Sequence, residues 1–309
     1  VALAQEGLYN SGNFIVHNDA QVGLHTNLIN DASFDQTNGL VGFYGNRPIT
    51  VTGSIPPTFW DTEILMGNNV FLDIPLMVRN NVNFMLGDFL TPTTTPTVNL
   101  NFMEDGFFGG ESNASKVVGF AEVNNRNVFS FPVGDAEQLR PLTFNAQGSV
   151  PRAICAYFFE NPSAPTSLSQ TFNVEEKVNN IGTVTDREFW ILQGNVPVQV
   201  TISWNTRSSL ITIPNATVES IIVVGWNKSS NQWVVIGNTA YSGDITNGFV
   251  TSETFVPNDY AAITFGTVPL PTDTFAVNNP TLGNYFLSPN GDGINDFLVI
   301  DGILLLEGF

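Results

Sequence analysis

The chain has 309 residues, of which 42% are hydrophobic and 12% are charged, and its 10 Lys and Arg against 28 Asp and Glu give a formal net charge of -18. Such an acidic surface repels phosphate backbones and anionic lipid, which argues against nucleic acid as a partner. No apolar run reaches the about 18 residues that a membrane-spanning helix needs. The sequence therefore predicts no transmembrane segment.

The first residues, Val1-Ala2-Leu3-Ala4, carry small side chains at positions 2 and 4. This Ala-x-Ala pattern is the one that signal peptidase accepts. We interpret residues 1–4 as the remnant of a signal peptide, which implies export across the inner membrane.

Most apolar segments that follow are short, rich in Val, Ile, Phe and Thr, and bounded by Gly, Pro or Asn. Helical spacing is almost absent, so the sequence predicts an all-β protein. Residues 5–150 contain brief strands separated by corners that tolerate left-handed backbone, such as Asn68-Asn69, Asn80-Asn81 and Gly87-Asp88. Irregular rungs of this kind favour a short parallel β-solenoid, and a β-sandwich is the alternative.

The end of this region predicts antiparallel strands. Lys116–Val123 and Asn127–Val133 flank a turn-forming Asn124-Asn125-Arg126, and strands are expected over Leu139–Ala146 and Arg152–Glu160. The sequence therefore predicts a hairpin, followed by two further strands.

One basic side chain in this part, Arg140, lies close in sequence to two carboxylates. We expect it to form an ion pair with Asp135 or Glu137 that pins the connecting loop. An exposed pair of this kind contributes only about 0–1 kcal/mol to stability.

Residues 151–268 predict a second domain, an immunoglobulin-like β-sandwich. Alternation places Val198, Val200, Ile202 and Trp204 on one strand face, as a half-buried strand requires. A hairpin is expected from Ser220–Trp226 to Gln232–Ile236, and strands over Gly248–Phe255 and Tyr260–Gly266. The core is expected to contain Trp204, Trp226 and Trp233.

Few residues suit catalysis. The single cysteine, Cys155, lies in an apolar run and is expected to be a buried thiol, since the two histidines, His17 and His25, are its only possible bases. Gly-x-Ser-x-Gly and His-Glu-x-x-His motifs are absent. The sequence therefore predicts no enzyme and no catalytic or metal-ligating residues.

Glycoside hydrolysis uses a pair of carboxylates, and the sequence contains two candidate pairs. Asp186 and Glu188 share a strand face with Trp190, and Glu175 and Glu176 are adjacent. A solvated strand edge is the favoured interpretation, because surface acids abound in this chain.

Aromatic residues raise one further possibility. Trp60 follows a Pro-Pro corner and is the best candidate for an exposed aromatic side chain in a carbohydrate-stacking or adhesive patch.

Residues 269–281 are proline-rich and predict an extended linker. The segment that follows combines a Ser-Pro step, two turn glycines and several Asp and Asn side chains, and then continues into the apolar strand Phe297-Leu298-Val299-Ile300. Its motif residues are Ser288, Pro289, Asn290, Gly291, Asp292, Gly293, Ile294, Asn295 and Asp296.

Over residues 282–303 this segment resembles the opening of the gliding motility-associated C-terminal domain, the type B sorting domain of proteins exported by the type IX secretion system of Bacteroidota. The resemblance implies recognition by the outer-membrane translocon and its shuttle proteins, followed by surface display or release. The family's domain continues through several further strands, so residues 282–309 are interpreted as the beginning of a truncated sorting domain.

The same loop matches a calcium-binding loop in part. Asn290, Asp292 and Gly293 match three positions of an EF-hand loop, but Ser288 and Val299 occupy its two strongest ligand positions. An Asx-rich turn is favoured, with weak cation binding by Asp292, Asn295 and Asp296 as the alternative; no cofactor is predicted.

Together these features predict a secreted or cell-surface protein with a structural or adhesive role, whose partners include other surface proteins or glycans. The alternative is a secreted glycan-binding or polysaccharide-degrading protein.

Overall fold

The computed structural model describes residues 7–36, 38–269, 297–300 and 303–306. The chain forms two compact units, Val1–Val268 and Pro269–Phe309. The described residues form β-strands and short 3-10 helices, so the predicted all-β class is confirmed. The 3-10 helices are η1 (Thr206–Ser208), η2 (Leu210–Thr212), η3 (Val218–Ser220) and η4 (Pro257–Asp259).

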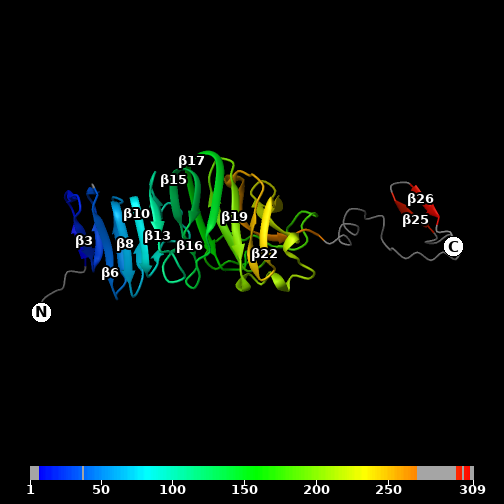
Figure 1. The fold of residues 1–309 in the computed structure, drawn as a ribbon, viewed down its shortest axis with the longest axis horizontal. Coiled ribbons are helices and arrows are strands. Elements are labelled where there is room, and N and C mark those ends of the chain that lie inside the picture. The colour runs from blue at the N-terminus through cyan, green and yellow to red at the C-terminus, as the bar shows by residue number, and fades with distance from the viewer. Residues whose placement is uncertain (1–6, 37, 270–296, 301–302, 307–309) are drawn as a thin grey trace. The chain divides into compact units, whose positions relative to one another are not determined.

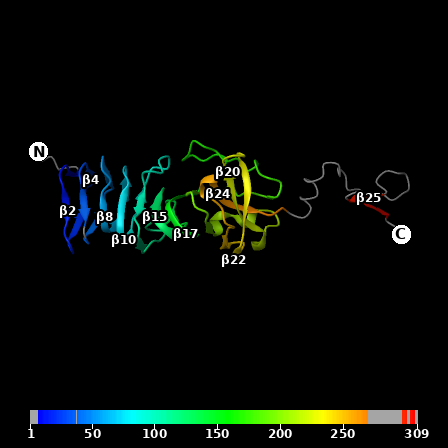
Figure 2. The same cartoon turned by 90° about the horizontal axis from the view of Figure 1, so that it is seen from above.

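The first half of the larger unit is a parallel β-solenoid, in which the chain passes repeatedly between two sheets (Figures 1 and 2). The first sheet consists of β1 (Gly7–Asn10), β4 (Asn27–Asn30), β7 (Ile49–Gly53), β9 (Val70–Leu72), β11 (Phe89–Leu90), β14 (Val117–Val118) and β16 (Val133–Gly134). The second begins with β3 (Gln21–Leu24), β6 (Leu40–Gly45), β8 (Thr58–Met66), β10 (Leu76–Leu86), β12 (Leu100–Phe102) and β15 (Ala121–Phe131). Smaller pairings involve β2 (Phe14–Val16), β5 (Phe34–Gln36) and β13 (Phe107–Gly109).

Stacking of like side chains explains why these short strands are stable. Leu28 pairs in register with Val51, and Val51 with Leu72, so one buried apolar side chain lies on the next along the first sheet. Each rung thus buries its apolar face on its neighbours, as a solenoid requires. The predicted solenoid is confirmed for this region, and the alternative of a sandwich is wrong here.

The parallel pattern ends at β15, which pairs antiparallel with β17 (Leu142–Phe158). The predicted hairpin at Asn124-Asn125-Arg126 is wrong, because β15 runs straight through these residues with a register irregularity. Asn125 has a positive φ of 54°, but the chain does not reverse there. The two strands predicted after this hairpin are one strand, β17, which also passes through the predicted domain boundary at residue 150.

At β17 the second sheet, which has 15 strands, branches into two antiparallel parts, which we call the β18 sheet and the β19 sheet. The C-terminal part of β17 pairs with β18 (Phe189–Gln193), and its N-terminal part with β19 (Gln199–Trp204). The β18 sheet continues through β24 (Tyr260–Thr267), β20 (Ile221–Asn227) and β21 (Gln232–Gly237), and the β19 sheet through β23 (Asn247–Thr251) and β22 (Ala240–Asp244). The predicted hairpin between β20 and β21 is confirmed, as is the inward alternation along β19.

Apolar side chains cover both faces of the β18 sheet. Trp190, Trp204 and Phe265 pack edge to face between the two sheets. On the outer face Trp226 and Trp233 form a second cluster with aromatic and aliphatic side chains that include residues of the 160–187 connection. All three tryptophans predicted for the core are buried.

In the smaller unit, β25 (Phe297–Ile300) pairs antiparallel with β26 (Ile303–Leu306). The strand predicted directly after the Asp/Asn-rich motif is therefore confirmed. The motif residues Ser288–Asp296 themselves lie outside the described residues, as does nearly all of the predicted linker.

Candidate functional site

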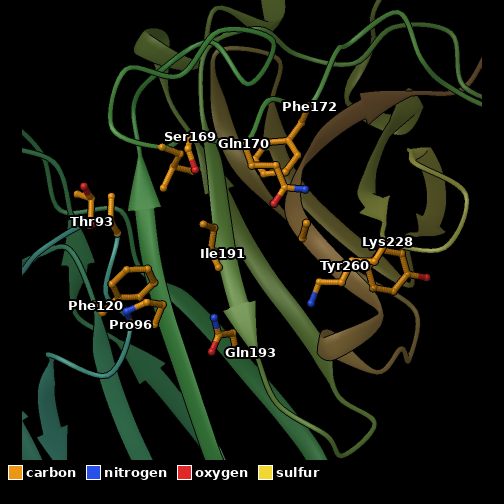
Figure 3. A pocket seen from close by; sticks show the side chains of 13 residues that line it. Thr93, Pro96, Phe120, Ser169, Gln170, Phe172, Ile191, Gln193, Lys228 and Tyr260 are labelled. Carbon is orange, nitrogen blue, oxygen red and sulfur yellow. The ribbon is translucent and has the colours of Figure 1, made fainter.

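A groove of about 240 Å³ lies on the outer face of the β18 sheet. Its floor comes from β18 and β24, and its walls come from loops that are distant in sequence (Figure 3). The lining residues are Thr93, Thr94, Pro96, Phe120, Leu168, Ser169, Gln170, Phe172, Ile191, Gln193, Lys228, Tyr260 and Ala261.

The floor follows from the strand period. Along β18 the side chains of Trp190 and Leu192 are buried, so the alternate residues Ile191 and Gln193 face the groove. Figure 3 shows Ile191 and Gln193 between the Thr93 loop on one side and Tyr260 on the other. β18 pairs with β17 along Phe189–Gln193, and with β24 at one residue pair, Trp190 with Ile263.

A hydrogen-bonded turn holds the upper rim. The Glu160 carboxylate accepts hydrogen bonds from the backbone N–H groups of Thr166 and Ser167, at 2.9 and 3.1 Å. Burial raises the pKa of Glu160, but these bonds and those from the two hydroxyl groups outweigh it and hold the pKa below its usual value. The Thr93 hydroxyl donates to the Ser167 carbonyl at 3.1 Å, which ties the two walls together.

The opposite wall is also anchored. The Lys228 ammonium donates to the Asn258 carbonyl at 2.8 Å. Tyr260 packs edge to face on Phe255, with ring centroids 5.4 Å apart, and burial together with the neighbouring Asp259 raises the pKa of its phenol.

The groove presents unused polar groups beside apolar surface. Among the described residues, the side chains of Gln170, Gln193 and Ser169 have no hydrogen-bond partner. Lys228 is the only charged residue in the lining. The lining thus combines uncharged polar groups, of which Ser169 and Gln170 are exposed, with apolar surface.

A different site contains Glu188, the carboxylate considered for hydrolysis. The solvated position predicted for Glu188 is wrong, because this residue is completely buried. One of its oxygens, Oε2, accepts hydrogen bonds from Arg140 Nη2 and from the Tyr157 hydroxyl, each at 2.6 Å. Burial, reinforced by the Glu188 charge, raises the pKa of Tyr157. Arg140 also donates to the Ser208 hydroxyl at 3.1 Å, so this cluster is part of the core.

The predicted partners of Arg140 are therefore wrong. Asp135 and Glu137 instead contact Arg207, with nitrogen–oxygen distances of 2.8 and 3.5 Å. The guanidinium of Arg207 also lies 3.9 Å from the centre of the Phe159 ring. Arg207, which is distant in sequence, thus holds the loop that Arg140 was expected to hold.

The remaining candidates are surface or core residues. Asp186 is exposed beside Arg187, and Glu175 beside Lys177, as a solvated edge predicts. Burial raises the pKa of the Cys155 thiol well above its usual value, in agreement with the predicted inert thiol. Trp60 is only partly exposed.

Within the described ranges no cluster of three or more His, Cys, Asp or Glu side chains is placed to hold a metal ion. The residues weighed for calcium, Asp292, Asn295 and Asp296, lie outside those ranges. Among the described residues there is also no helix long and apolar enough to cross a membrane.

The groove residues were not predicted from the sequence. The alternation along β18 was available, and it places Gln193 on the face opposite Leu192. The meeting of loops 93–96 and 168–172 with β18 and β24 has no local signal. Comparison with protein-family models, with curated proteins and with solved structures finds no match for the chain.

Proposed function

We propose that the chain is a type IX secretion cargo that acts outside the cell as a structural or adhesive β-protein. It reaches the surface through the periplasm, and the segment from Ser288 to Asp296 is the address read by the translocon and its shuttle proteins. Gliding or attachment is the process that such a protein serves.

The observation that supports this proposal is the division of the chain into two units. Residues Val1–Val268 form a body in which a single apolar core extends from the solenoid into the antiparallel sheets. The motif and its following strand, β25, belong to the other unit. Export machinery that reads a separate terminal unit has no need to open the core of the cargo.

The antiparallel region fits this role. We propose that its two sheets, which separate at β17, form an immunoglobulin-like sandwich, a module common in cell-surface proteins. It is joined to the solenoid through the pairing of β15 with β17.

Export can be tested in the native cell with the complete gene. Replacing residues 288–296 by a Gly-Ser segment of the same length is expected to retain the protein in the periplasm, measured by protease shaving of intact cells and by fractionation. The matched control replaces residues 271–279 in the same way and is expected to reach the surface normally. Normal surface display of the first variant would overturn the proposal.

A further inference from the structure

We propose that the groove on the β18 sheet binds one uncharged sugar unit of a glycan. This inference goes beyond export and does not depend on it, because binding is measured on purified protein.

The first argument is hydrogen bonding. Gln170 and Gln193 each present an amide, with donors and an acceptor, and Ser169 presents a hydroxyl, and none of the three has a partner among the described residues. Sugar hydroxyl groups both donate and accept, so they match such mixed groups better than a purely donating or accepting ligand does. Because the three residues come from two separate segments, one ligand would contact the rim and the floor together (Figure 3).

The second argument is charge. The protein has a formal net charge of -18, which disfavours an acidic polysaccharide. The one cation in the lining, Lys228, already donates to the Asn258 carbonyl. No carboxylate lines the groove, so a cationic ligand finds no counter-charge there. Lys228 is exposed, so water solvates its charge, and an uncharged ligand needs no counter-charge from this lining.

The third argument is size and shape. At about 240 Å³ the groove lies below the about 300–1,000 Å³ of sites for drug-sized ligands. Apolar surface from Ile191, Pro96 and Tyr260 lies beside the amides, as is needed to pack against the C–H face of a sugar ring. A single ring of a longer chain fits these dimensions.

A peptide fits less well. Extended peptides bind mainly by adding a strand to a free sheet edge. One edge of β18 is paired with β17 from Phe189 to Gln193, so a peptide could add a strand only on the β24 side, where Trp190 already pairs with Ile263.

The test titrates the purified full chain with uncharged trisaccharides, namely maltotriose, cellotriose, mannotriose and triacetylchitotriose, by isothermal titration calorimetry. Trigalacturonate serves as the charged comparison. Saturable binding of at least one uncharged probe, with weaker binding of trigalacturonate, is expected. Absence of saturable binding of every uncharged probe up to about 10 mM overturns the proposal.

Variants then locate the site. Gln193→Leu keeps the volume of the side chain but removes the groups that would hydrogen-bond to the sugar, and it is expected to weaken binding about 3- to 10-fold. Gln170→Ala, on the exposed rim, is expected to weaken binding by the same factor. The matched control is Gln21→Ala, an exposed glutamine in β3 that is remote in sequence from every groove residue. Unchanged binding by both groove variants, with circular dichroism showing native folding, would also overturn the proposal.

Discussion

The solenoid and the antiparallel region bury polar groups in different ways. In the solenoid buried polar residues contact partners on a neighbouring rung, as where Asn10 Nδ2 donates to Asn30 Oδ1 at 2.7 Å and Lys116 Nζ donates to Asp88 Oδ1 at 3.1 Å. In the antiparallel region Arg140, Tyr157 and Glu188 come from separate strands and loops and form a cluster that occurs once. The polar contacts of the solenoid thus join neighbouring rungs, whereas the cluster of the antiparallel region joins segments that are distant in sequence.

This difference has an energetic consequence. Contacts between neighbouring rungs make solenoid stability approximately a sum of local terms. A cluster that joins distant segments instead couples β17, β18 and the 140 loop, so its loss affects all of them. Substitutions in the two regions should therefore differ both in size and in how far their effects extend.

The largest effect is expected from Glu188→Ala, which leaves the buried Arg140 guanidinium without its carboxylate. Breaking a buried ion pair costs about 3–5 kcal/mol in the free energy of unfolding, and urea unfolding would measure it. Asp186→Ala, at an exposed position, is expected to change stability by less than about 0.5 kcal/mol.

A double variant sharpens the interpretation of that result. Arg140→Met with Glu188→Met removes both charges, so it is expected to recover most of the stability that Glu188→Ala loses. If Glu188→Ala lowers the free energy of unfolding by less than about 1 kcal/mol, the cluster does not couple β17, β18 and the 140 loop as we infer.

A smaller and more local effect is expected from Asn30→Ala in the solenoid. The Asn30 amide donates to the carbonyls of Ala32 and Ile55, at 3.0 and 2.7 Å, and its oxygen accepts from Asn10. Leaving these buried groups unsatisfied costs about 1–3 kcal/mol.

Hydrogen exchange distinguishes the two regions directly. For Asn30→Ala, faster exchange is expected only in the rungs around β1, β4 and β7, whereas Glu188→Ala is expected to speed exchange throughout β17, β18 and β24. The exposed Asn13→Ala is the control for the solenoid. Equal spreading of the two effects would contradict the comparison.

The smallest effect is expected from acid at the rim of the groove. Because the folded state holds the pKa of Glu160 below its unfolded value, its contribution to stability is present above the unfolded pKa and is lost as pH falls through the folded pKa. The protection of the Thr166 and Ser167 amides, measured relative to their intrinsic exchange rate at each pH, is therefore expected to fall in acid. In Glu160→Gln this loss of protection with falling pH should be absent, since no carboxylate remains to titrate; an identical pH profile of protection in both proteins would refute this assignment.

The sequence by itself determined the all-β class, the inward face of β19, the hairpin between β20 and β21 and the strand that follows the Asp/Asn-rich motif. These features are local, because the period of a strand and the chemistry of a turn are written in consecutive residues. Even locally the prediction failed where Asn125 adopts a turn-like backbone inside a continuous strand, since the pairing of β15 with β17 overrides it.

Only the tertiary structure decided which charges meet and where the groove lies. Arg140 pairs with Glu188, and Arg207 pairs with Asp135, across long stretches of chain. Each arginine has other carboxylates that are nearer in sequence. Likewise Gln193 and Gln170 line the same groove only because the 160–187 connection folds over the β18 sheet. An ion pair or a groove depends on distance in space, and distance in space follows from how the strands pair, which no short stretch of sequence encodes.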